Sequence, residues 1–100
     1  MNFGLSDSCL NQIVSVFKKF PQIEKVIVFG SRVKGSYKNG SDIDLALTGS
    51  IDLETLTKID CKLDDLLLPY TFDIVAVDKI DNPDLVDHIN RVGIILYKKK

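Results

Sequence analysis

The chain contains 100 residues, carries a formal net charge of -1 and is 45% hydrophobic. This length suits one small domain, spanning residues 1–100, with a modest core and no room for a second domain. The balanced charge excludes a disordered chain and a protein that holds nucleic acid strongly by charge alone.

Sequence signals for export and membrane insertion are missing from the chain. No N-terminal segment joins basic residues to a long apolar core, and no apolar run approaches the length that crosses a bilayer. Cys9 and Cys61 show no paired metal-type spacing, and we expect reduced, packed thiols. These features predict a cytoplasmic protein with no membrane contact.

The first predicted elements are a helix over about residues 6–20 and a strand over residues 26–29. Apolar residues in the first segment follow helical spacing, with Ser6 or Asp7 as the cap and Pro21 as the stop. The second segment is β-branched and aromatic, which indicates a buried strand that ends before a glycine.

The residues after this strand suit a phosphate group. Gly30 would let the backbone turn sharply and approach a ligand, and Ser31 offers a hydroxyl and a helix cap. Free N–H groups at a helix start attract anions. In the basic segment 32–40, Arg32 is the expected phosphate contact, and the lysines are interpreted as solvated charges. An ordinary turn at Gly30-Ser31 is the alternative.

A second strand opens with two carboxylates. Alternation along a strand places Asp42 and Asp44 on one face and Ile43 and Leu45 on the other. Neighbouring carboxylates repel each other and lose hydration, so this arrangement is costly without a cation. Oxygen ligands in this number suit Mg²⁺ or Mn²⁺. The alternative is a turn at Ser41-Asp42 with Asp44 as a charge on an edge strand.

The next predicted element is an amphipathic helix over about residues 52–67, with Asp52 as its cap. Its apolar residues form one face. Asp60, Asp64 and Asp65 lie away from that face, so they are interpreted as solvated charges rather than catalytic groups.

A third strand over residues 71–77 carries Asp73 within an apolar run. A carboxylate in such surroundings is rarely left unpaired, because burying a lone charge costs several kcal/mol or more. Asp73 therefore either pairs with a Lys or Arg, or faces the first two aspartates across neighbouring strands. Asn82-Pro83 then starts a last helix, Gly93 stops it, and residues 94–97 predict an added edge strand.

These motifs together resemble the DNA polymerase β-like nucleotidyltransferase superfamily. Gly30-Ser31, ten further residues and then Asp42-Ile43-Asp44 match its signature, and Asp73 matches its third carboxylate. In particular, the chain resembles the minimal nucleotidyltransferases, the MntA-type antitoxins encoded beside HEPN-domain toxins. The resemblance implies an α/β (α+β) fold with a small mixed β-sheet and helices packed on one face.

The resemblance also implies a site and a reaction. Its catalytic and metal-binding residues are Asp42, Asp44 and Asp73, and its phosphate-binding residues are Gly30, Ser31, Arg32 and Ser41. The implied cofactors are two Mg²⁺ ions, with Mn²⁺ as a substitute, and the implied substrate is ATP. AMP would pass to a tyrosine hydroxyl of a helical HEPN toxin encoded nearby, and the two proteins would form a hetero-oligomer.

Two other functions remain open on the sequence. A catalytically idle nucleotide-binding module could neutralise its partner by contact. An active nucleotidyltransferase could instead modify a small molecule or an RNA end. The three intact carboxylates argue against the first alternative, and the short chain without a basic surface argues against the second.

Overall fold

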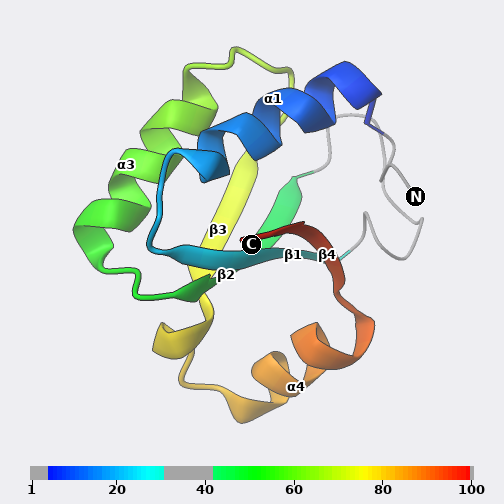
Figure 1. Ribbon diagram of the computed structural model, residues 1–100. Helices are drawn as coiled ribbons and strands as arrows, with labels where there is room; N and C mark the ends of the chain where they lie inside the picture. Colours follow the sequence, from blue (N-terminus) through cyan, green and yellow to red (C-terminus); the bar gives the residue numbers. More distant parts are fainter. Residues whose placement is uncertain (1–4, 31–41, 100) are drawn as a thin grey trace.

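The computed structural model describes residues 5–30 and 42–99, so the predictions for Ser31, Arg32 and Ser41 lie outside the described residues. Four strands form one sheet in the order β3-β2-β1-β4 (Figure 1). Their bounds are β1 (Ile23–Phe29), β2 (Ile43–Gly49), β3 (Phe72–Ala76) and β4 (Ile94–Lys98). β1 is antiparallel to β2 and β4, whereas β2 is parallel to β3. The predicted mixed sheet and its added edge strand are confirmed.

In residues 5–30 and 42–99, three α-helices accompany the sheet, and each begins at a polar cap. They are α1 (Asp7–Lys18), α3 (Leu53–Asp64) and α4 (Pro83–Val92), and a short 3-10 helix, η1 (Val77–Lys79), follows β3. The side chains of Ser6, Asp52 and Asn82 accept backbone N–H groups of the first turns. These caps satisfy N–H groups that have no partner within the helix, which explains why the helices begin there.

The sheet has helices on both faces. Ile43, Leu45 and Leu47 join the larger core beneath α1 and α3, whereas Ile27 and Ala46 pack with Ile89 of α4 on the opposite face. The expectation that the helices pack on one face therefore holds for α1 and α3 and is wrong for α4. The cause is the strand alternation itself, since β1 and β2 are apolar on both sides and need cover on both.

The bounds of two elements and the burial of one cysteine differ from the sequence predictions. β1 begins at Ile23, three residues before the predicted start, and α3 ends at Asp64. Cys9 is buried as expected, whereas Cys61 is exposed. Within the part of the chain that the structure describes, no helix is long and apolar enough to cross a membrane.

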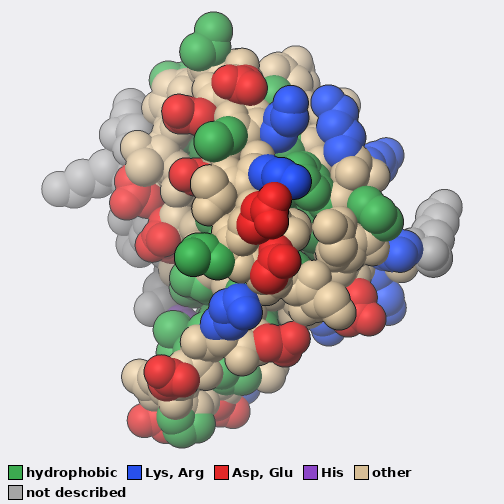
Figure 2. Space-filling model, turned by 90° about the vertical axis from the view of Figure 1, so that its left-hand side faces the viewer, with side chains coloured by type: hydrophobic (Ala, Val, Ile, Leu, Met, Phe, Trp, Pro, Cys, Tyr) green, Lys and Arg blue, Asp and Glu red, His purple; other side chains and the backbone are tan. Residues whose placement is uncertain are grey.

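On the side of α3, Lys and Arg gather at the upper right of the surface, while Asp and Glu spread over its left half (Figure 2).

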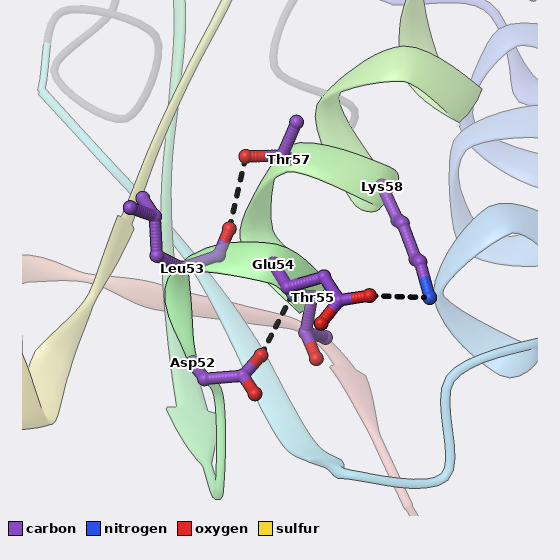
Figure 3. Close-up of polar contacts among 6 residues, drawn as sticks. All are labelled: Asp52, Leu53, Glu54, Thr55, Thr57 and Lys58. Carbon is purple, nitrogen blue, oxygen red and sulfur yellow. Dashed lines mark hydrogen bonds and ion pairs between the residues drawn. The ribbon is translucent and has the colours of Figure 1, made fainter.

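The N-terminus of α3 depends on Asp52, whose Oδ1 accepts the Thr55 backbone N–H at 2.8 Å (Figure 3). Replacing Asp52 with alanine is expected to lower the Tm near neutral pH, because this N–H loses its acceptor. Hydrogen bonds from the Thr55 side chain and backbone lower the pKa of Asp52 from its ordinary value of 3.8. The folded state therefore binds fewer protons than the unfolded chain. The contribution of Asp52 to stability is lost as the pH falls through the pKa that Asp52 has in the folded state.

Thermal unfolding of the wild type, Asp52→Ala and Asp52→Asn near neutral pH and at about pH 2 checks this prediction. Asparagine is also a good cap, so Asp52→Asn should retain most of the stability without the acid-dependent change. A wild type and an Asp52→Ala variant with equal Tm near neutral pH would contradict the role of the cap.

Candidate active site

Two carboxylates meet across the parallel pair of strands. Asp44 is the second residue of β2, Asp73 is the second residue of β3, and the strand register pairs them directly. Residues paired in this way lie on the same face of a sheet, so the two side chains are neighbours. Asp44 is half-buried and Asp73 is exposed. Among the described residues, neither forms an ion pair with a Lys or Arg. The strand register places Asp73 beside Asp44, while the catalytic and metal-binding roles of Asp42, Asp44 and Asp73 stay a prediction.

The environment of Asp44 disfavours its negative charge. Burial is the largest cause that raises the pKa of this carboxyl above its ordinary value of 3.8. The negative charges of Asp73 and Asp42 raise the pKa further, and so does a hydrogen bond between the Asp44 and Asp73 side chains. Such a bond needs a proton on one carboxyl group. The pair is therefore a place where a positive charge is favoured.

Gly30 lies directly against this pair. It follows Phe29, which pairs with Asp44 across β1 and β2, and its φ is +81°, in the left-handed region. A Cβ at this position would collide with Oδ2 of Asp44. Only glycine satisfies both the backbone conformation and the close approach. The predicted glycine turn is thus next to the predicted acidic residues, while its contact with phosphate stays a prediction.

Asp42 occupies a more peripheral position. It precedes the first residue of β2 and is exposed, yet its charge contributes to the raised pKa of Asp44. Across residues 5–30 and 42–99, no three His, Cys, Asp or Glu side chains are grouped as a metal site would require. The site thus consists of a close pair, Asp44 and Asp73, with Asp42 beside it. Its donors are all carboxylate oxygens, which no described Lys or Arg pairs with and which are the ligands that Mg²⁺ and Mn²⁺ prefer.

A hollow of about 260 Å³ opens between α3 and the edge of β3. Phe72 and Ile74 belong to the face of the sheet beneath α3, so by strand alternation the carboxylates of Asp44 and Asp73 lie on the opposite face. Its lining residues are Leu56, Thr57, Asp60, Phe72, Asp73 and Ile74. Asp60, predicted to be only a solvated charge, is exposed but shares this hollow with Asp73. Helical periodicity could not reveal this, because it shows only that Asp60 lies off the apolar face. The packing of α3 beside β3 decides which element Asp60 faces.

Residues 11–100 of the chain match the family described as Polymerase beta, Nucleotidyltransferase. Since the match covers most of the chain, the protein belongs to this family of nucleotidyltransferases. The resemblance inferred from the Gly-Ser and Asp-x-Asp motifs is confirmed at that level.

A particular relative is a protein of Methanocaldococcus jannaschii that carries the provisional name protein adenylyltransferase. It is 38% identical over 56 residues, which cover 56% of this chain and 53% of the relative. The match therefore spans about half the length of that relative.

Solved structures with a similar fold are toxin–antitoxin complexes. A complex with AMP-PNP contains a chain that superposes with a TM-score of 0.75, at 22% identity over 91% of this chain and 74% of that chain. A complex of an MNT antitoxin with a tri-AMPylated HEPN toxin of Shewanella oneidensis gives a TM-score of 0.70, at 19% identity over 95% of this chain and 74% of that chain. At these identities the comparison establishes the shared fold.

Proposed function

We propose that this protein transfers AMP from ATP to a tyrosine hydroxyl of a helical HEPN-domain toxin and thereby acts as its antitoxin. The directly paired Asp44 and Asp73 carry this proposal, because two neighbouring carboxylates beside a glycine turn suit a metal-bound triphosphate. Family membership supports the reaction class. The provisional name of the archaeal relative and the AMPylated toxin in a complex of similar fold support the acceptor.

The carboxylates have distinct roles in this proposal. Asp44 and Asp73, joined by Asp42, would hold Mg²⁺, or Mn²⁺ in its place, at two positions. When bound, the metal neutralises the triphosphate and lowers the pKa of the attacking hydroxyl. Asp73 is the exposed member of the pair and lies on the outermost strand of the sheet, so it is the group best placed to orient the acceptor hydroxyl or to take its proton.

The other predicted site residues would position the phosphates. Gly30 has no side chain, so its backbone leaves space beside Asp44 for a phosphate to approach. Ser31, Arg32 and Ser41 would add hydroxyl and guanidinium donors, which suit phosphate oxygens. In-line attack then depends mainly on positioning and on charge neutralisation, both of which a small rigid site can supply.

A partner protein would complete the acceptor side. The small domain can hold a nucleotide on one end of its sheet, and the acceptor tyrosine would come from the toxin in a hetero-oligomer. We propose that this pairing takes place in the cytoplasm, without strong direct nucleic-acid binding.

ATP binding measured by calorimetry, with and without Mg²⁺, tests the nucleotide site. The wild type should bind ATP with Mg²⁺, and Asp42→Asn/Asp44→Asn should lose the metal-dependent part. Asp65→Asn is the matched control, since Asp65 is an exposed carboxylate at the end of α3 that does not line the hollow. Mixing the protein with its HEPN partner, ATP and Mg²⁺ should then add AMP units to the partner's mass.

Two results separate this proposal from its rivals. An Asp42→Asn/Asp44→Asn variant that still neutralises the toxin in cells would indicate an idle binding module. AMP transfer to a small molecule or an RNA end, with none to the partner protein, would leave the reaction class intact and replace the acceptor.

A further inference from the structure

In the part of the chain that the structure describes, the outer edge of β3 is an unpaired strand edge next to the candidate active site. The sheet order ends at β3, and among the described residues no other segment hydrogen-bonds to its outer side. An exposed edge presents backbone N–H and C=O groups that can pair with an extended segment of another chain. Asp73 lies on this same strand, so a segment added there would run past the carboxylate pair.

The hollow beside that edge has an apolar base and the Asp60 carboxylate at its side, while the Asp73 carboxylate lies on the other face of β3 beside Asp44. Leu56, Phe72 and Ile74 are half-buried apolar residues, whereas Asp60 and Asp73 are exposed carboxylates. The Thr57 hydroxyl already donates to the Leu53 carbonyl oxygen at 2.9 Å. Neither Asp60 nor Asp73 forms an ion pair with any described residue. A side chain that enters the hollow would therefore meet apolar surface together with the Asp60 carboxylate, which no described Lys or Arg pairs with.

The nearest basic residue along α3 does not compensate this charge. Lys58 pairs with Glu54 at 3.3 Å, and both point away from β3 (Figure 3). Asp60 thus remains available to a positive charge from outside the chain. Metal binding at the active site would neutralise Asp73 but would leave Asp60 unchanged.

We propose that the acceptor protein docks an extended segment along the outer edge of β3, with a Lys or Arg beside the acceptor hydroxyl that pairs with Asp60. This inference rests on the proposed function and specifies how the acceptor reaches the site. Backbone pairing sets the direction of the segment. Neighbouring residues of an extended segment point to opposite faces of the sheet, so the acceptor residue can lie beside the Asp73 carboxylate while its cationic neighbour enters the hollow and pairs with Asp60. Asp60 is then a specificity-determining residue rather than a catalytic one.

Peptide binding to the full chain tests the inference without requiring turnover. The probes are two seven-residue peptides with a central tyrosine and β-branched neighbours, one flanked by lysines and the other by glutamates. The lysine peptide should bind more tightly by about 1.4-fold to fivefold, the range for an exposed ion pair. Amide shifts in the ¹H–¹⁵N spectrum should cluster on residues 72–76 and on the part of α3 that lines the hollow.

Reversing the charge of Asp60 tests whether this residue sets the preference for the lysine peptide. Asp60→Lys should abolish or reverse the preference for the lysine peptide, whereas the control Asp65→Lys, which makes the same charge change outside the hollow, should preserve it. The spectra also report whether each variant is folded. Equal binding of both peptides, no binding of either, or shifts on the β4 edge would overturn the inference.

Failure of the inference and failure of the proposed function give different results. Metal-dependent ATP binding with no peptide preference would reject the docking mode alone. Peptide binding at β3 without metal-dependent ATP binding would retain the docking surface and reject the proposed reaction.

Discussion

Replacing Asp44 with asparagine is expected to reduce AMP transfer by roughly 10³-fold, because a bound metal ion supplies several kcal/mol of charge stabilisation. The same change should stabilise the metal-free protein near neutral pH. Burial and the Asp73 and Asp42 carboxylates oppose the charge of Asp44, and an asparagine amide can instead donate to Asp73. Relief of one like-charge pair across two strands is worth about 0.2–1 kcal/mol.

The stability difference should depend on pH. Because the pKa of Asp44 is raised above 3.8 in the folded state, the folded protein binds more protons than the unfolded chain in the window just above 3.8. The stability of the wild type therefore falls as the pH rises through that window, and the advantage of Asp44→Asn should disappear below it. Urea unfolding in a metal chelator across the acidic range measures this difference.

Addition of Mg²⁺ provides the control for the same pair of proteins. The wild type should gain stability with Mg²⁺ and ATP, since a ligand that binds only the folded state stabilises it. Asp44→Asn should gain little. If the variant were less stable than the wild type in the chelator near neutral pH, the site would not be an uncompensated carboxylate pair.

Replacing Gly30 with alanine is expected to abolish measurable AMP transfer and to destabilise the fold. The residue has a φ of +81°, and a Cβ would meet the carboxylate of Asp44. The backbone conformation alone costs a non-glycine residue about 1–2 kcal/mol. The new Cβ would also displace Asp44 from Asp73, which would disrupt the site directly. Chemical unfolding and transfer assays on the same preparation measure the two effects.

Gly49→Ala separates these two effects. Gly49 also has a positive φ, of +127°, and a Cβ there would meet the backbone carbonyl oxygen of Gln22. It pairs with Ile23 at the opposite end of β2 from Asp44. This variant should lose a comparable amount of stability but keep its transfer rate per folded molecule. Equal activity losses in the two variants would show that Gly30 acts only through stability.

Much of this fold follows from local sequence patterns. Ser6, Asp52 and Asn82 cap the predicted helices, and the strand that carries Asp73 lies close to its predicted bounds. Capping and periodicity depend on neighbouring residues along the chain, so the sequence contains the information needed. The start of β1 was harder to predict from the sequence, because residues 23–25 pair with β2 and β4 rather than with their own neighbours in the chain.

The sequence by itself determined the family, the carboxylates and the glycine turn, since each is a fixed spacing of particular side chains. Only the tertiary structure decided that Asp44 pairs directly with Asp73 and that Gly30 has no room for a side chain. It also decided that Asp60 of α3 and Asp73 of β3 line one hollow. It also decided that α4 covers the second face of the sheet. Strand register and helix placement join residues far apart in the chain, and local spacing cannot specify those contacts.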